Sequence, residues 1–182
     1  RSLRVINDDT VQPGQGFGTH GHRDMEIVSY VLEGALAHRD STGGGSVTRP
    51  GSVQRMSAGT GVRHSEFNAS QSERVHFLQI WFLPNKTGIP PGYEEKYFDE
   101  AEKRGKLRLV ASPDGANGSV KIQTDAKMFA ALVDGDERIE HSIGAADDVY
   151  VHIARGHVSL NGHPLETGDA AMLTNEDRLV LD

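Results

Sequence analysis

The sequence predicts an all-β protein made of two barrels, and three observations support this fold class. Short runs rich in β-branched and aromatic residues alternate with glycine, proline and polar turns, as in sandwiches and barrels. One of these runs is apolar enough to be buried on both faces. The two halves of the chain also share a plan, in which an apolar strand is followed by a polar residue, a glycine and a second strand.

The composition limits the classes of function that the protein can have. The chain has 182 residues, of which 36% are hydrophobic, enough for one large domain or two small ones with a packed core. The net charge of −7, without a cluster of basic residues, argues against nucleic-acid binding. No apolar stretch or signal pattern predicts a membrane protein, so we take the cytoplasm as the default location. The absence of cysteine excludes disulfides and thiolate chemistry.

The strongest strand signals lie in the first half of the chain. Residues 27–32, IVSYVL, are dense in β-branched and aromatic residues, and residues 40–45 form a polar, glycine-rich hairpin connection. Residues 75–83, VHFLQIWFL, are the most apolar segment, so we predict a central strand that is buried on both faces and ends at Pro84. Further strands are expected at residues 3–6 and 36–39 and after the turns at residues 49–54 and 57–61.

A charged segment separates the two halves. Residues 93–105, YEEKYFDEAEKRG, have the Glu/Lys spacing of a short solvated helix closed by a glycine. We therefore predict an N-terminal barrel over residues 1–92, a connector over residues 93–106 and a C-terminal barrel over residues 107–182. A strand is predicted almost at the first residue and Asp182 lies within an apolar run, so we expect both termini to be truncated.

Two clusters make the N-terminal barrel a candidate metal site. His20 and His22 lie two residues apart on a predicted strand, so their rings point to one face. His64 and Glu66 repeat this spacing after a tight bend. If both strands line one interior, three imidazoles and a carboxylate converge, which suits a first-row divalent metal. The ligand types alone do not choose among Fe(II), Mn(II), Co(II), Ni(II), Cu(II) and Zn(II).

Several other residues are expected to have structural roles. Trp81 and Phe82 are predicted to lie in the core or at an interface. The remaining histidines have no paired spacing on a shared strand face and are predicted to be surface or satisfied core residues: His38, His76, His141, His152, His157 and His163. When the halves are aligned on Gly34 and Gly156, the C-terminal barrel has lost the candidate ligands, because His20, His22 and Glu26 correspond to Ser142, Gly144 and Asp148.

The first half resembles the cupin superfamily. The first cupin motif, which combines His-x-His with a glutamate and flanking glycines, is matched by Gly14, His20, His22, Glu26 and Gly34. The second motif is matched loosely by Gly51, Ser57, Gly59, His64 and Asn68, with serine in place of proline and two extra residues before the histidine. Together with the stretches HRDMEIVSYVLEG and MSAGTGVRHSEFN, these features are similar to the pirin family, the two-barrel cupins that include bacterial quercetin 2,3-dioxygenases.

This resemblance implies a bicupin of two jelly-roll barrels with one divalent transition metal, Fe(II) above all. The implied metal ligands are His20, His22, His64 and Glu66, with Glu26 supporting them from a second shell. The implied reaction is dioxygen-dependent cleavage of the heterocyclic ring of flavonols such as quercetin, with release of carbon monoxide. Glu66 is then the expected catalytic base for the substrate's 3-hydroxyl proton. The alternative is a non-catalytic metal-binding protein whose redox state controls a regulatory protein partner.

Overall fold

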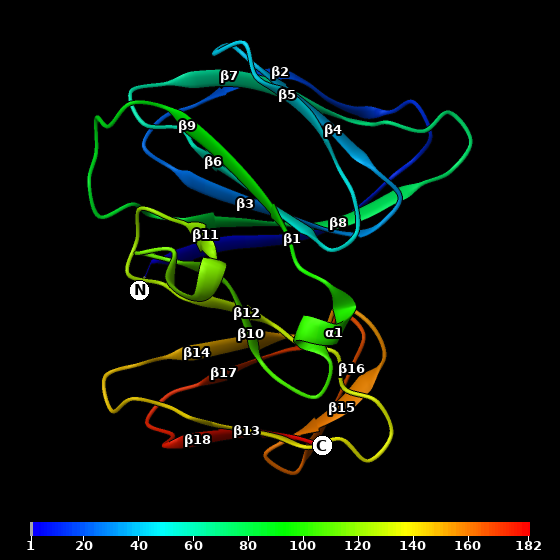
Figure 1. Ribbon diagram of the computed structural model, residues 1–182, viewed down its shortest axis with the longest axis vertical. Helices are drawn as coiled ribbons and strands as arrows, with labels where there is room; N and C mark the ends of the chain where they lie inside the picture. Colours follow the sequence, from blue (N-terminus) through cyan, green and yellow to red (C-terminus); the bar gives the residue numbers. More distant parts are fainter. Residues whose placement is uncertain (1) are drawn as a thin grey trace. The chain divides into compact units, whose positions relative to one another are not determined.

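The computed structural model describes residues 2–182, which consist almost entirely of β-strands and turns (Figure 1). The predicted all-β class is confirmed. Contacts divide these residues into two compact units. The N-terminal unit contains Ser2–Asp99 and Leu109–Phe129, and the C-terminal unit contains Glu100–Arg108 and Ala130–Asp182. Each unit is thus assembled from two stretches of chain, and residues 109–129 pack with the first half.

The N-terminal unit contains two sheets that lie face to face (Figure 1). One sheet has the order β1-β8-β3-β6-β9 and the other has the order β2-β7-β4-β5. The strands are β1 (Leu3–Val11), β2 (Gly16–His22), β3 (Glu26–Glu33), β4 (Leu36–Asp40), β5 (Gly45–Thr48), β6 (Ser52–Ser57), β7 (Val62–Asn68), β8 (Val75–Phe82) and β9 (Gly92–Tyr97). A third, small sheet has the order β11-β10-β12, from β10 (Arg108–Ser112), β11 (Val120–Lys121) and β12 (Met128–Ala130).

Strand β8 is the central element of the larger sheet. It pairs with β1 on one side and β3 on the other, and six of its eight residues are buried, so the predicted central strand is confirmed. Side chains that alternate along the strands fill the space between the sheets. Ile27 of β3 and Met56 of β6 pack there with Val62 of the opposite sheet. These contacts identify the inner face of each strand.

The segment predicted as a helical connector is folded differently. Its first part forms β9, which pairs antiparallel with β6, and the helix α1 covers only Glu100–Lys103. The helical prediction for residues 93–97 was therefore wrong. The physical reason is the partner offered by β6: Arg55 donates a hydrogen bond from Nη2 to Glu94 Oε2 at 3.2 Å. A charged segment with good helix propensity becomes an edge strand when a neighbouring strand supplies both backbone and side-chain partners.

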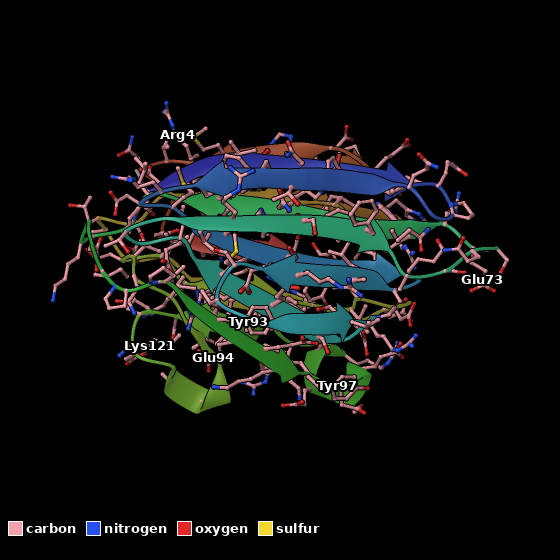
Figure 2. All side chains as sticks on the ribbon, turned by 90° about the horizontal axis from the view of Figure 1, so that it is seen from above. Arg4, Glu73, Tyr93, Glu94, Tyr97 and Lys121 are labelled. Atoms are coloured by element: carbon pink, nitrogen blue, oxygen red, sulfur yellow. The ribbon has the colours of Figure 1, made fainter. Side chains whose placement is uncertain are left out.

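A polar network joins the outer face of the larger sheet to residues 119–123. Arg55 donates from Nε to the Lys121 carbonyl oxygen at 2.9 Å, and the Lys121 amide donates to Glu94 at 3.0 Å. Figure 2 shows Glu94 and Lys121 close together beside β9. Glu26 completes the network, because its Oε2 accepts hydrogen bonds from Ser57 Oγ and from the Gln123 amide, both at 3.0 Å. This network attaches residues 119–123 to the sheet.

The C-terminal unit has its own apolar core. Its strands form a four-stranded sheet of order β13-β18-β15-β16 and a two-stranded sheet of β14 and β17. The strands are β13 (Ile139–Ser142), β14 (Val149–His152), β15 (His157–Leu160), β16 (His163–Glu166), β17 (Ala170–Leu173) and β18 (Arg178–Leu181). Buried isoleucine and leucine side chains from both sheets pack together, among them Ile139, Leu160 and Leu173. Within residues 2–182, no helix is long and apolar enough to cross a membrane.

We predict that Glu26→Ala lowers the free energy of unfolding by about 1–3 kcal/mol, because the part-buried Gln123 amide and the buried Ser57 hydroxyl lose their acceptor. The matched control is Glu33→Ala on the same strand, where the exposed ion pair with Arg74 should contribute less than about 1 kcal/mol. Urea unfolding of both variants measures the difference. Equal losses in the two variants would show that Glu26 does not anchor residues 119–123.

Candidate metal centre

Two neighbouring strands bring three histidines together at one point of the inner face. Strands β2 and β7 pair antiparallel, with His20 directly opposite His64. His22 lies on the same face as His20 because side chains two residues apart on a strand point the same way. The ring centroids lie 4.4 Å apart for His20 and His64, 4.8 Å for His20 and His22, and 4.9 Å for His22 and His64. The predicted convergence of these rings is present in the structure.

The ring nitrogens of this cluster are available to bind an ion. His20 donates a hydrogen bond from Nδ1 to the Gly18 carbonyl oxygen at 2.8 Å, which leaves the Nε2 lone pair free. Nε2 of His22 and both ring nitrogens of His64 are buried without a hydrogen-bond partner. Candidate ligand atoms of the three histidines lie within 4.8 Å of one another. Buried polar atoms without partners are costly, and a coordinated metal ion would satisfy them.

Burial keeps two of these imidazoles neutral. Burial is the largest of the causes that lower the pKa of His64 to about 3, and the neighbouring His20 and His22 rings contribute in the same direction. Burial also lowers the pKa of His22, with a smaller contribution from His20. Only the neutral imidazole has a lone pair for a metal. His64 is therefore in the neutral, ligating form across the neutral and mildly acidic range.

Glu66 lies beside the histidine cluster and is 1% exposed. Its Oε2 accepts a 2.6 Å hydrogen bond from Gln79 Nε2, while Oε1 lies 3.5 Å from the Ser29 hydroxyl. A carboxylate oxygen of Glu66 lies within 4.8 Å of ligand atoms of His64 and His38. Burial raises the pKa of the Glu66 carboxyl, and the hydrogen bond from Gln79 partly offsets this effect. Glu66 is thus a buried carboxyl group next to the cluster.

His38 is a member of this neighbourhood that the sequence pattern did not single out. It is buried on β4, and its ring centroid lies 5.3 Å from that of His64. Its Nε2 bonds to Asp40 at 3.0 Å and its Nδ1 lies 3.4 Å from the Gln54 amide nitrogen, so both nitrogens are occupied. His38 is therefore a hydrogen-bonded core residue behind His64. A lone histidine on a different strand carries no spacing signal that could have located it.

The structure places Glu26 on the other face of the sheet from the histidines. Its neighbour Ile27 packs between the two sheets, so the Glu26 side chain points outward. There it binds Ser57 and the Gln123 amide. The supporting position expected behind the ligands is occupied instead by Gln79 and Ser29, which contact Glu66.

A surface hollow of about 350 Å³ opens beside the cluster. Its lining includes His22 together with the side chains of Arg23 and Arg63. This volume falls within the range of small-molecule sites. Among residues 2–182, both groups of side chains arranged to hold a metal lie in the N-terminal unit.

Comparison with known proteins identifies the family. Residues 1–82 match the family model described as Pirin, and residues 109–182 match the model described as Quercetinase C-terminal cupin domain. The chain is 45% identical over 178 residues to a protein of Escherichia coli (strain K12) named quercetin 2,3-dioxygenase. That alignment covers 98% of this chain and 76% of the relative.

Solved structures agree with this assignment. The crystal structure of YhhW from Escherichia coli superposes with a TM-score of 0.93 at 44% identity, covering 99% of this chain and 76% of that chain. The bacterial pirin YhhW from Escherichia coli in complex with nickel(II) superposes with a TM-score of 0.92 at 43% identity, with the same coverage. These matches confirm the predicted two-barrel cupin fold. The chain belongs to the pirin family of cupins.

Proposed function

We propose that this protein is a metal-dependent dioxygenase that cleaves the heterocyclic ring of flavonols such as quercetin, with dioxygen as co-substrate and carbon monoxide as a product. The observation that carries the proposal is the convergence of three imidazoles beside a buried carboxyl group, with buried nitrogens of His22 and His64 that have no hydrogen-bond partner. The name of the Escherichia coli relative, quercetin 2,3-dioxygenase, supports the substrate class. The proposed location remains the cytoplasm.

The proposed ligands are His20, His22, His64 and Glu66. Three imidazoles and one carboxylate suit a borderline divalent ion and include no thiolate that would favour a softer one. Four protein ligands would leave a six-coordinate ion with room for substrate and dioxygen, whereas four-coordinate zinc would have none. We therefore propose Fe(II). The structure of bacterial pirin YhhW in complex with nickel(II) supports a divalent transition metal at this site.

When bound, the metal would lower the pKa of the substrate's 3-hydroxyl and hold both reactants together. The histidines act as ligands and hold no proton on their ligating nitrogens. Glu66 takes the 3-hydroxyl proton, which leaves the flavonol electron-rich enough to react with oxygen. Burial raises the pKa of the Glu66 carboxyl in the metal-free protein, and a lengthened or broken metal bond would leave an oxygen free for this proton.

We predict that His22→Ala and His64→Ala each weaken metal affinity by more than about 100-fold, because each removes one ligand from a closely spaced set. Titration of metal-free protein with Co(II) or Ni(II) against a competing chelator measures the dissociation constants. The matched control is His163→Ala, since His163 is exposed on β16 of the C-terminal unit. Wild-type affinity in both ligand variants would contradict the proposed ligand set.

The metal-free protein should lose stability on acidification partly through His64. Its pKa of about 3 lies below the usual 6.5, so between these values the unfolded chain binds a proton that the folded protein does not. Stability that is present above the unfolded value is therefore lost as the pH falls. His64→Gln should show a smaller loss between about pH 7 and about pH 5 than wild type in urea unfolding with chelator present. His163→Gln should follow wild type, and an unchanged pH dependence in His64→Gln would argue against a buried neutral imidazole.

The activity is tested with protein loaded anaerobically with Fe(II) and then given quercetin and oxygen. We expect loss of the flavonol absorbance together with release of carbon monoxide. Glu66→Gln should lower kcat by about 100-fold or more, because it keeps the shape of the side chain and removes the base. If no metal among Fe, Mn, Ni, Co and Cu supports turnover, the dioxygenase proposal is wrong, and the redox-responsive regulatory role is the alternative to pursue.

A further inference from the structure

Two polar residues on β8 form a hydrogen-bonded chain that ends on Glu66. The Trp81 indole donates from Nε1 to Gln79 Oε1 at 3.1 Å, and Gln79 Nε2 donates to Glu66 Oε2 at 2.6 Å. Gln79 is 9% exposed and Glu66 is 1% exposed, so solvent has little access to these bonds. The chain crosses from the larger sheet to the carboxylate on the opposite sheet.

The chemistry of the indole fixes the direction of this chain. An indole N–H can only donate, so the atom of Gln79 that faces Trp81 must be the amide oxygen. The NH₂ group of Gln79 must then face Glu66, where it can only donate. Oε2 of Glu66 is therefore held as an acceptor. The 2.6 Å bond from Gln79 thus engages Oε2, whereas Oε1 has only the 3.5 Å contact with Ser29 and is the oxygen more available to a metal ion.

Trp81 also contacts the histidine cluster. Its ring lies edge-on to His22, with centroids 5.0 Å apart and an interplanar angle of 85°. Gln79 and Trp81 point to the same face because they lie two residues apart on β8. Trp81 contacts His22 on β2, and Gln79 donates a hydrogen bond to Glu66 on β7. Strand β8 therefore contacts residues of both strands that carry the proposed ligands.

We propose that Gln79, oriented by Trp81, is a positioning residue that holds Oε2 of Glu66 and leaves Oε1 as the oxygen that would bind the metal. This inference rests on the proposed function, since it gives Glu66 its roles there. The inference does not involve the histidines. Of the four proposed ligands, Glu66 is the one to which Gln79 donates its hydrogen bond. Without the amide, the carboxylate could rotate and either oxygen could face the ion.

The test compares Gln79→Met with Asn68→Leu. Both changes replace a buried amide by an apolar side chain of similar size, and Asn68 binds the Val11 and Glu73 carbonyl oxygens instead of a proposed ligand. We expect Gln79→Met to weaken Co(II) affinity by about 10-fold or more, to alter the visible spectrum of the Co(II) protein and to lower kcat more than it changes KM. Asn68→Leu should lower stability without changing the affinity or the spectrum.

Trp81→Phe keeps the ring against His22 and removes only the donor that orients Gln79. It should change the Co(II) spectrum in the same direction as Gln79→Met but by less, and it tests the proposal even if Gln79→Met does not fold. A wild-type affinity and spectrum in both β8 variants would overturn the positioning role. If wild-type protein does not turn over quercetin but the β8 variants still alter affinity and spectrum, the proposed reaction fails while the positioning of the metal-binding oxygen stands.

Discussion

The register between β2 and β7 is the constraint on which the site depends. Antiparallel pairing sets His20 opposite His64, and the alternation of side chains then brings His22 to the same face. A slip of one residue would turn one strand's histidines to the outer face. Val62, which packs in the core from the same strand as His64, opposes such a slip because it would also become exposed. Core packing and ligand placement are therefore fixed by the same pairing.

The opposite sheet completes the site with polar residues in an otherwise apolar layer. Ser29 of β3 and Gln79 of β8 are directly paired and both reach Glu66. Burying them is favourable only because they are hydrogen-bonded. The unpartnered nitrogens of His22 and His64 break this rule, which is why they indicate a binding site. The C-terminal unit, by contrast, has a core of aliphatic side chains.

The sequence predicted the features that depend on local periodicity. The all-β class, the buried strand within residues 75–83 and the shared face of His20 and His22 follow from the residue pattern along single strands, whereas the convergence with His64 also requires β2 to pair with β7. Features that depend on strand pairing were not predictable. Residues 93–97 form a strand because β6 offers partners, and Glu26 points outward because of the packing of Ile27. Gln79 did leave a signal, as a lone amide within the apolar run VHFLQIWFL, but only the structure shows its contact with Glu66.

The central claim is that one ion is held by residues of β2 and β7. Anomalous scattering at the metal edge from crystals of the Ni(II)-loaded protein tests it most directly. The account predicts a single strong peak about 2.0–2.2 Å from nitrogens of His20, His22 and His64 and from one oxygen of Glu66. A peak elsewhere, or none between these four side chains at full metal loading, would contradict it.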